Sequence, residues 1–135
     1  MQTNSARASS CAAAVCVAIL LASPATAGPA VRIDNFGRVD ATLYRGAQPE
    51  GRDYADLKAL GVKTIINLTS DDAEPNEKAM TEGAGMTYVQ IPMNTHTPPT
   101  SAQLAEFLRI VNDPANQPAY VHCVGGVCVF IGICT

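Results

Sequence analysis

Apolar and polar residues follow one another in five short stretches that are typical of β-strands. Residues 31–40 and 42–45 have the alternation of short strands, the first of them at an edge of a sheet. Residues 62–68 form a β-branched run, which is typical of a parallel strand buried on both faces. Residues 86–91 alternate again, and residues 119–122 form the last predicted strand.

Three segments between these strands have the apolar spacing of helices. Residues 53–60 carry one apolar stripe, and Gly61 fits the position just after a helix C-terminus. Residues 76–82 predict a short second helix. A third helix begins at Thr100 or Ser101 as its N-cap. Its predicted apolar stripe consists of Leu104, Phe107, Leu108 and Val111.

Strands that alternate with helices predict an α/β domain with a mostly parallel sheet flanked by helices. In such sheets ligands bind beyond the carboxyl ends of the strands. Three loops are expected at that end: residues 69–75, residues 92–99, and the segment after residue 122. Prolines in residues 92–99 remove hydrogen-bond donors, so this loop is predicted to be irregular throughout.

The N-terminal residues have a different character from the rest. An unbroken apolar run covers residues 11–22, too short to span a bilayer comfortably, and Ala25-Thr26-Ala27 offers a small-x-small cleavage site. We expect residues 1–27 to be a signal peptide and residues 28–135 to be a single domain, secreted or periplasmic.

Composition narrows the range of partners. The net charge is −3 and the chain has no Lys/Arg run, which argues against nucleic acid and, after signal cleavage, against a membrane surface. The sequence has no zinc-ligand spacing, Walker loop or dinucleotide glycine fingerprint. We therefore predict neither a metal nor a cofactor.

The last strand leads into Tyr120-Val121-His122-Cys123-Val124-Gly125-Gly126. A cysteine after a β-branched run, followed by glycines, presents a nucleophile and backbone N–H groups to an anion. The pattern resembles the His-Cys-x5-Arg loop of cysteine-dependent protein tyrosine and dual-specificity phosphatases. Between residues 36 and 126 the chain resembles the atypical dual-specificity phosphatases, since Tyr44-Arg45-Gly46-Ala47-Gln48-Pro49 matches their entry motif.

This resemblance implies roles for particular residues. Cys123 would attack phosphorus to give a phosphocysteine, and His122 would order the loop. A general acid is expected on a neighbouring loop, where Asn94 or His96 stands; Asp71 and Asp72, on another loop at the same end of the sheet, are the second candidates. The phosphate would be held by the loop residues Val124, Gly125, Gly126, Val127, Cys128 and Val129. The implied substrate is a protein phosphorylated on Tyr, Ser or Thr, or a small phosphate ester.

The end of the chain departs from the family pattern. Val129 stands at the Arg position, and residues 130–134 are too short and too β-branched for the helix that follows the loop in the family. We therefore predict an incomplete domain that lacks the helices after the phosphate loop and has weak or no phosphatase activity. A non-catalytic phosphate-binding protein and a frameshifted gene product are alternatives, and a rhodanese-like sulfurtransferase is another.

Overall fold

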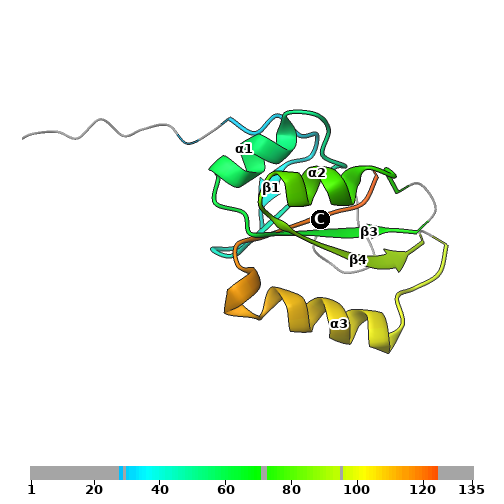
Figure 1. Cartoon of the computed structure of the whole chain (residues 1–135). Coiled ribbons are helices and arrows are strands. Elements are labelled where there is room, and N and C mark those ends of the chain that lie inside the picture. The colour runs from blue at the N-terminus through cyan, green and yellow to red at the C-terminus, as the bar shows by residue number, and fades with distance from the viewer. Residues whose placement is uncertain (1–27, 29, 71–72, 95, 125–135) are drawn as a thin grey trace, which may run out of the picture.

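Five strands of the described chain form one sheet in the spatial order β1-β2-β5-β3-β4, with helices on both faces (Figure 1). The computed structural model describes residues 28, 30–70, 73–94 and 96–124. In chain order the elements are β1 (Gly37–Arg38), β2 (Leu43–Gly46), α1 (Asp53–Ala59), β3 (Thr64–Thr69), α2 (Glu77–Gly83), β4 (Thr87–Met93), α3 (Ser101–Val111), the 3₁₀ helix η1 (Pro114–Asn116) and β5 (Ala119–His122). The predicted α/β class with a mostly parallel sheet is confirmed.

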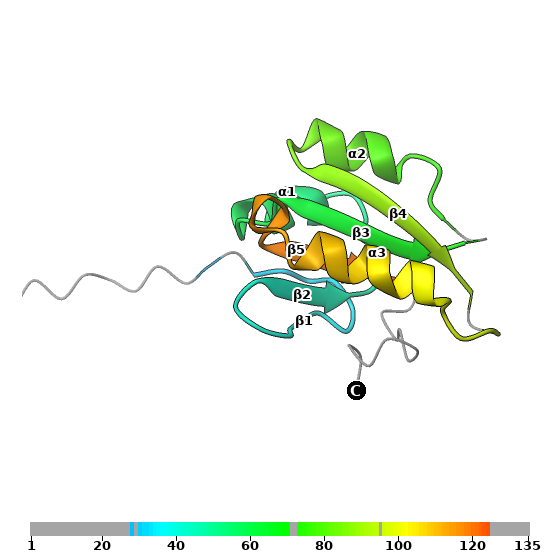
Figure 2. The ribbon, with the colours of Figure 1, turned by 90° about the horizontal axis from the view of Figure 1, so that it is seen from below.

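Strand β5 lies between β2 and β3 and is parallel to both (Figure 2). Tyr120 of β5 is level with Tyr44 on one side and with Ile65 on the other. Strand β4 adds to β3 in parallel, and among these five strands only β1 runs antiparallel to its neighbour, β2. The last strand of the described chain therefore occupies the middle of the sheet.

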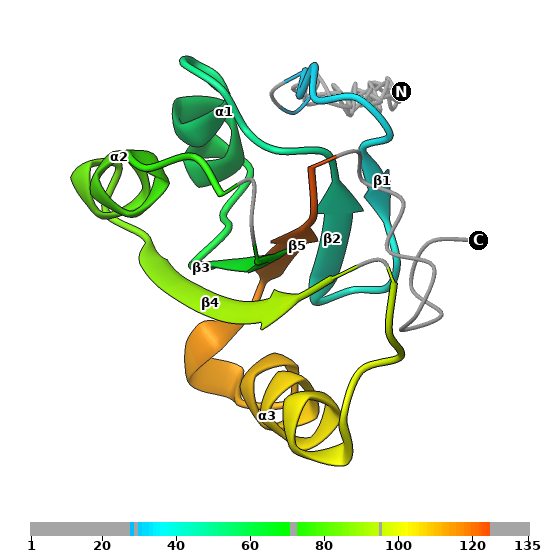
Figure 3. The same ribbon diagram turned by 90° about the vertical axis from the view of Figure 1, so that its right-hand side faces the viewer.

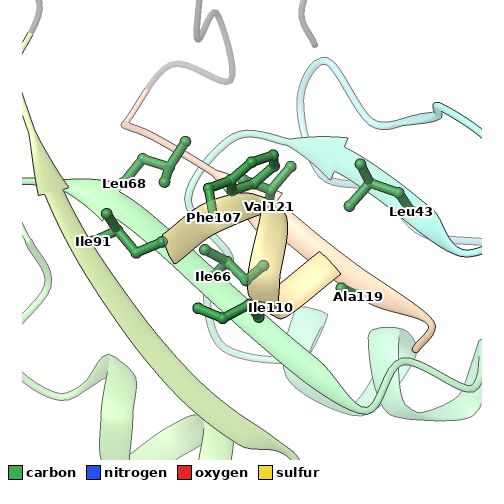
Figure 4. Packing of buried hydrophobic residues seen from close by; sticks show 8 residues of the cluster. All are labelled: Leu43, Ile66, Leu68, Ile91, Phe107, Ile110, Ala119 and Val121. Atoms are coloured by element: carbon green, nitrogen blue, oxygen red, sulfur yellow. The ribbon is translucent and has the colours of Figure 1, made fainter. Parts of the chain in front are cut away.

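Helices α1 and α2 cover one face of the sheet, and α3 covers the other (Figure 3). Side chains along β5 point alternately to the two faces, because successive residues of a strand do so. The cluster on the α3 face consists of Leu43, Ile66, Leu68, Ile91, Phe107, Ile110, Ala119 and Val121 (Figure 4). The cluster on the other face consists of Ile33, Tyr54, Leu57, Val62, Ile65, Met86 and Tyr120.

Local sequence signals set both ends of the regular elements. Thr100 caps α3, since its side chain accepts from the Gln103 N–H while the Gln103 side chain accepts from the Thr100 N–H. Gly61 follows α1 at φ +97°, a conformation that glycine adopts at little cost. Both features agree with the predicted helix boundaries.

Four of the five predicted strands have different limits in the structure, and two of these differences have a clear physical cause. Only Gly37–Arg38 of residues 31–40 is a strand, because the Phe36 N–H turns back to the Ile33 carbonyl and Asn35 has φ +54°. Strand β4 continues through Pro92 to Met93, where an irregular loop was predicted. A proline is tolerated here because β4 is an edge strand and because its pairing with β3 is irregular between Asn67 and Thr69, opposite Pro92.

The buried stripe of α3 also differs from the prediction. Phe107 is buried as expected, but Leu108 is 54% exposed and Ile110, which was not assigned to the stripe, is buried. Leu104 and Val111 are half-buried. The helix therefore faces the sheet mainly through residues 107 and 110, which are three positions apart.

Gly46 allows close packing between β2 and β5. A methyl group at residue 46 would overlap the Tyr120 Oη and would lie 3.3 Å from Ile33 Cγ2. We predict that Gly46→Ala lowers the free energy of unfolding by about 1–3 kcal/mol, the usual cost of overpacking, measured by urea denaturation. Gly83→Ala is the control, because a methyl there meets no atom within 4 Å. A Gly46→Ala variant as stable as the control would contradict this account.

Candidate active site at the end of strand β5

The predicted nucleophile follows directly after the central strand of the sheet. Cys123 is the first residue beyond β5 and is half-buried. The strand ends at His122, whose backbone is level with Gly46 of β2 and with Asn67 of β3. Neighbouring strands therefore hold the chain on both sides just before Cys123.

His122 is fully buried on the α1 and α2 face. Its Nε2 lies 2.5 Å from the Glu77 Oε1 at the start of α2. The Tyr120 ring is stacked against the imidazole at a centroid distance of 5.9 Å. These contacts fix the orientation of the ring, although its predicted role in ordering the phosphate loop stays a prediction.

Glu77 is a buried carboxylate that the sequence pattern did not single out. Its Oε2 accepts a hydrogen bond from Asn67 Nδ2 at 2.6 Å, and its Oε1 faces His122. The Asn67 amide also donates to Tyr88 Oη at 3.1 Å and accepts from the Thr69 N–H at 2.7 Å. The network joins α2, β3, β4 and β5. Glu77 and Thr81 are the buried residues of α2, and both are polar, so apolar spacing along the chain provided no signal for this network.

Two tyrosines near Glu77 are held in the neutral form. Burial, reinforced by the Glu77 charge, raises the pKa of Tyr54 from 10.0 to about 12. Burial also raises the pKa of Tyr88, and the Glu77 charge adds to this effect. The Tyr54 hydroxyl donates to the Pro49 carbonyl at 3.1 Å. Both shifts follow mainly from burial, and the Glu77 charge adds to them.

The segment after β2 supports the start of the cysteine loop. The Gln48 N–H donates to the Val124 carbonyl at 3.4 Å, and the Tyr120 hydroxyl donates to the Ala47 carbonyl at 2.7 Å. The Val124 side chain is 50% exposed. One backbone hydrogen bond thus joins the entry segment to the cysteine loop, and the Tyr120 side chain joins the same segment to β5.

A hollow of about 440 Å³ opens beside Val124. The charged residues that line it are Arg32, Asp34, Glu50, Asp53 and Glu74. Carboxylates outnumber the guanidinium, so the described lining does not attract an anion. A phosphate would have to be held by the cysteine loop itself rather than by this hollow.

The general-acid candidates have different positions. His96 is exposed in the loop after β4, and β3 separates β4 from β5, so the loop belongs to a strand two places away from Cys123. Asn94 Oδ1 accepts hydrogen bonds from the N–H groups of His96 and Thr97 and from the Thr97 hydroxyl. Asn94 therefore stabilises the loop turn.

The other predicted site residues lie outside the described residues: Asp71, Asp72, Gly125, Gly126, Val127, Cys128 and Val129. Their roles, like those of Cys123 and His96, stay predictions. Within residues 28, 30–70, 73–94 and 96–124, no group of three His, Cys, Asp or Glu side chains could hold a metal ion. None of the helices in these ranges has the length and apolarity needed to cross a membrane.

The mostly parallel sheet thus carries Cys123 directly after its central strand, β5. A family model described as "DSP-PTPase phosphatase fused to NAD+ Kinase" matches residues 32–129, more than half of the chain. The chain belongs to this phosphatase family.

Individual relatives agree with the family assignment. The probable tyrosine-protein phosphatase DG1060 of Dictyostelium discoideum is 31% identical over 66% of this chain and 56% of its own length. A DUF442 phosphatase candidate from Shewanella putrefaciens has a TM-score of 0.64 at 27% identity, covering 71% of this chain and 65% of that one. The core catalytic domain of the PP-IP phosphatase SIW14 from S. cerevisiae has a TM-score of 0.63 at 27% identity, covering 70% and 59%. The chain thus spans between half and two thirds of the length of these relatives.

The pKa of Tyr54 predicts a loss of stability at alkaline pH. In the unfolded chain Tyr54 ionises near pH 10, whereas in the fold its pKa is about 12. The stabilisation by neutral Tyr54 is complete below pH 10 and is lost as the pH rises toward 12. We expect the urea midpoint to fall over this range, and to fall less steeply in Tyr54→Phe. An equally steep fall in the variant would contradict the assignment.

Proposed function

We propose that this protein is an exported cysteine-dependent phosphatase that hydrolyses a phosphate monoester through a phosphocysteine. The observation that carries the proposal is the position of Cys123 directly after the central strand β5, within the family match over residues 32–129. Export rests on the expected signal peptide at residues 1–27.

The proposed reaction has two steps. The Cys123 thiolate attacks phosphorus, the S–P bond forms, and the P–O bond to the leaving alkoxide or phenoxide breaks. A general acid, for which His96 and Asp72 are the candidates, gives the leaving oxygen a proton. Water then attacks the phosphocysteine, releasing inorganic phosphate and regenerating the thiolate. The thiolate requires positive potential near neutral pH, which the backbone N–H groups after Cys123 would supply.

The substrate class is inferred from the relatives. DG1060 is named a tyrosine-protein phosphatase and SIW14 a PP-IP phosphatase. We propose that the present chain acts on a protein phosphorylated on Tyr, Ser or Thr, or on a small phosphate ester. The carboxylates around the hollow beside Val124 favour a substrate with few negative charges besides the reacting phosphate.

The valine at position 129 leads us to expect a low rate of phosphate-ester hydrolysis. The family places an Arg at this position, and donors around the equatorial oxygens carry most of the stabilisation in phosphoryl transfer. The same residue favours a second candidate function, a non-catalytic protein that binds phosphate weakly through the backbone of the loop.

Cys123→Ser tests the nucleophile. We expect the full chain to release phosphate slowly from an aryl phosphate, and Cys123→Ser to reduce this rate to the uncatalysed background, because a hydroxyl is a far poorer nucleophile than a thiolate at neutral pH. The release is followed by absorbance, and Cys134→Ser is the control. A rate that does not change in Cys123→Ser would contradict the mechanism. Binding of vanadate without any turnover would instead favour the second candidate.

Val129→Arg tests the reason for a low rate. We expect kcat/KM for the aryl phosphate to rise by about a hundredfold or more, since a charge clamp of this kind is worth about 10³–10⁵ in other phosphoryl-transfer enzymes. Val129→Gln, which supplies hydrogen-bond donors but no charge, is the control. If Val129→Arg raises the rate no more than Val129→Gln does, the missing charge does not limit the rate.

A further inference from the structure

The buried carboxylate of Glu77 has no part in the proposed chemistry, yet it lies against the residue that precedes the nucleophile. Its two oxygens face two nitrogen atoms, His122 Nε2 at 2.5 Å and Asn67 Nδ2 at 2.6 Å. The titratable groups near it are Tyr54 of α1, Tyr88 of β4 and His122 of β5. The Glu77 side chain has no exposed surface, so these contacts replace water.

The donors and acceptors around Glu77 indicate which ring nitrogen of His122 carries the proton. The Asn67 oxygen is taken by the Thr69 N–H, so its amide nitrogen faces Glu77 as a donor. The remaining carboxylate oxygen then accepts from His122, which places the imidazole proton on Nε2. The opposite ring atom, Nδ1, is buried and has no hydrogen-bond partner in the described part of the chain. A proton on Nδ1 would therefore be an unsatisfied buried donor.

From this network we propose that Glu77 is a positioning residue for the nucleophile: its carboxylate fixes the tautomer and the ring orientation of His122, and thereby the direction in which the chain leaves β5 at Cys123. The inference rests on the proposed function of Cys123. It assigns a role to a residue on α2, 46 positions before the nucleophile in the sequence.

The contacts of His122 explain why an effect at its ring would reach Cys123. The backbone of His122 pairs with Gly46 and Asn67, so it has little freedom to absorb a rotation of the side chain. Asn67 contributes both to this backbone pairing and to the side-chain contact with Glu77. The next residue, Cys123, is the first beyond the end of the strand. A change in the geometry of His122 is therefore expected to change the backbone direction at Cys123.

Glu77→Gln is the first variant, because it keeps the size of the side chain but removes one acceptor. The new amide oxygen can serve Asn67 or His122, but not both. If the amide oxygen accepts from Asn67, the amide nitrogen must donate to Nε2 of His122. The imidazole proton then moves to Nδ1, where it is one unsatisfied donor. If the amide oxygen instead accepts from His122, the amide nitrogen of residue 77 faces the amide nitrogen of Asn67, and neither donor has an acceptor. We therefore expect the proton of His122 to move to Nδ1.

Nitrogen-15 NMR of the histidine side chains measures the tautomer directly. The chain has two histidines, and exposed His96 provides an internal reference for buried His122. The reactivity of Cys123 is measured on the same full-length samples by iodoacetamide alkylation, with tandem mass spectrometry separating Cys123 from Cys128. We expect Glu77→Gln to slow alkylation of Cys123 at pH 7 by about tenfold, because only the thiolate reacts and a displaced loop stabilises it less.

Two matched variants complete the experiment. Glu82→Gln removes an exposed carboxylate from the same helix and should leave the tautomer and the alkylation rate at wild-type values. Asn67→Asp combined with Glu77→Gln exchanges the carboxylate and the amide between the two positions. The carboxylate on β3 then accepts from the amide nitrogen on α2, and the amide oxygen on α2 accepts from His122. This double variant should recover the Nε2 tautomer and the wild-type alkylation rate.

Several outcomes would overturn the proposal. A Glu77→Gln variant with the wild-type alkylation rate would do so whichever tautomer it shows, and a slower rate without a tautomer change would mean that the effect does not pass through His122. Recovery of folding but not of the alkylation rate in the double variant would also contradict it.

Phosphate release by the wild type is a separate measurement. If phosphate release does not depend on Cys123 but Glu77→Gln slows alkylation, the proposed function fails while the positioning of the cysteine holds. If release depends on Cys123 and alkylation does not respond to Glu77→Gln, the positioning role fails and the phosphatase proposal remains.

Discussion

A carboxylate that is taken out of water must be matched by donors, and in this fold that requirement joins three parts of the chain. Glu77 is held by Asn67 of β3 and His122 of β5, and it anchors the start of α2 against the sheet. Removing one member of such a buried group typically costs about 3–5 kcal/mol, because the remaining charge is left without a partner. The position of α2 and the end of β5 therefore depend on each other.

The same region also explains why the entry segment has its particular residues. The Tyr120 hydroxyl on β5 donates to the Ala47 carbonyl, and it fits beside β2 because Gly46 has no side chain. The Phe36 and Tyr120 rings stack at a centroid distance of 6.2 Å. Phe36, Tyr120 and His122 thus form a row of stacked rings, and the imidazole and its carboxylate partner are both fully buried, which strengthens the interaction between them.

Residue patterns predicted the elements that depend on local signals. The capping box at Thr100, the glycine after α1 and the β-branched run of β3 each act within a few residues, and the structure confirms these elements. Features set by the sheet as a whole were missed. Whether Pro92 can belong to a strand depends on β4 being at an edge, and which residues of α3 are buried depends on how that helix lies on the sheet.

The candidate site divides in the same way. The sequence motif identified His122 and Cys123, since they are adjacent and follow a recognisable strand. Glu77 could not be found in this way, because its partners are 10 and 45 residues away and a glutamate in the first turn of a short helix is usually exposed. A buried polar network is defined by distant contacts rather than by neighbouring residues.

The central position of β5 has a consequence for how this chain folds. The four other described strands precede β5 in sequence, but β2 and β3 are joined only through it. Until β5 inserts, these strands can form at most two separate pairs, each with an unprotected edge that another copy could extend. Sheet closure must then wait for contacts between distant segments, which slows folding. Proteins that bind exposed strand edges would compete with β5 during that interval.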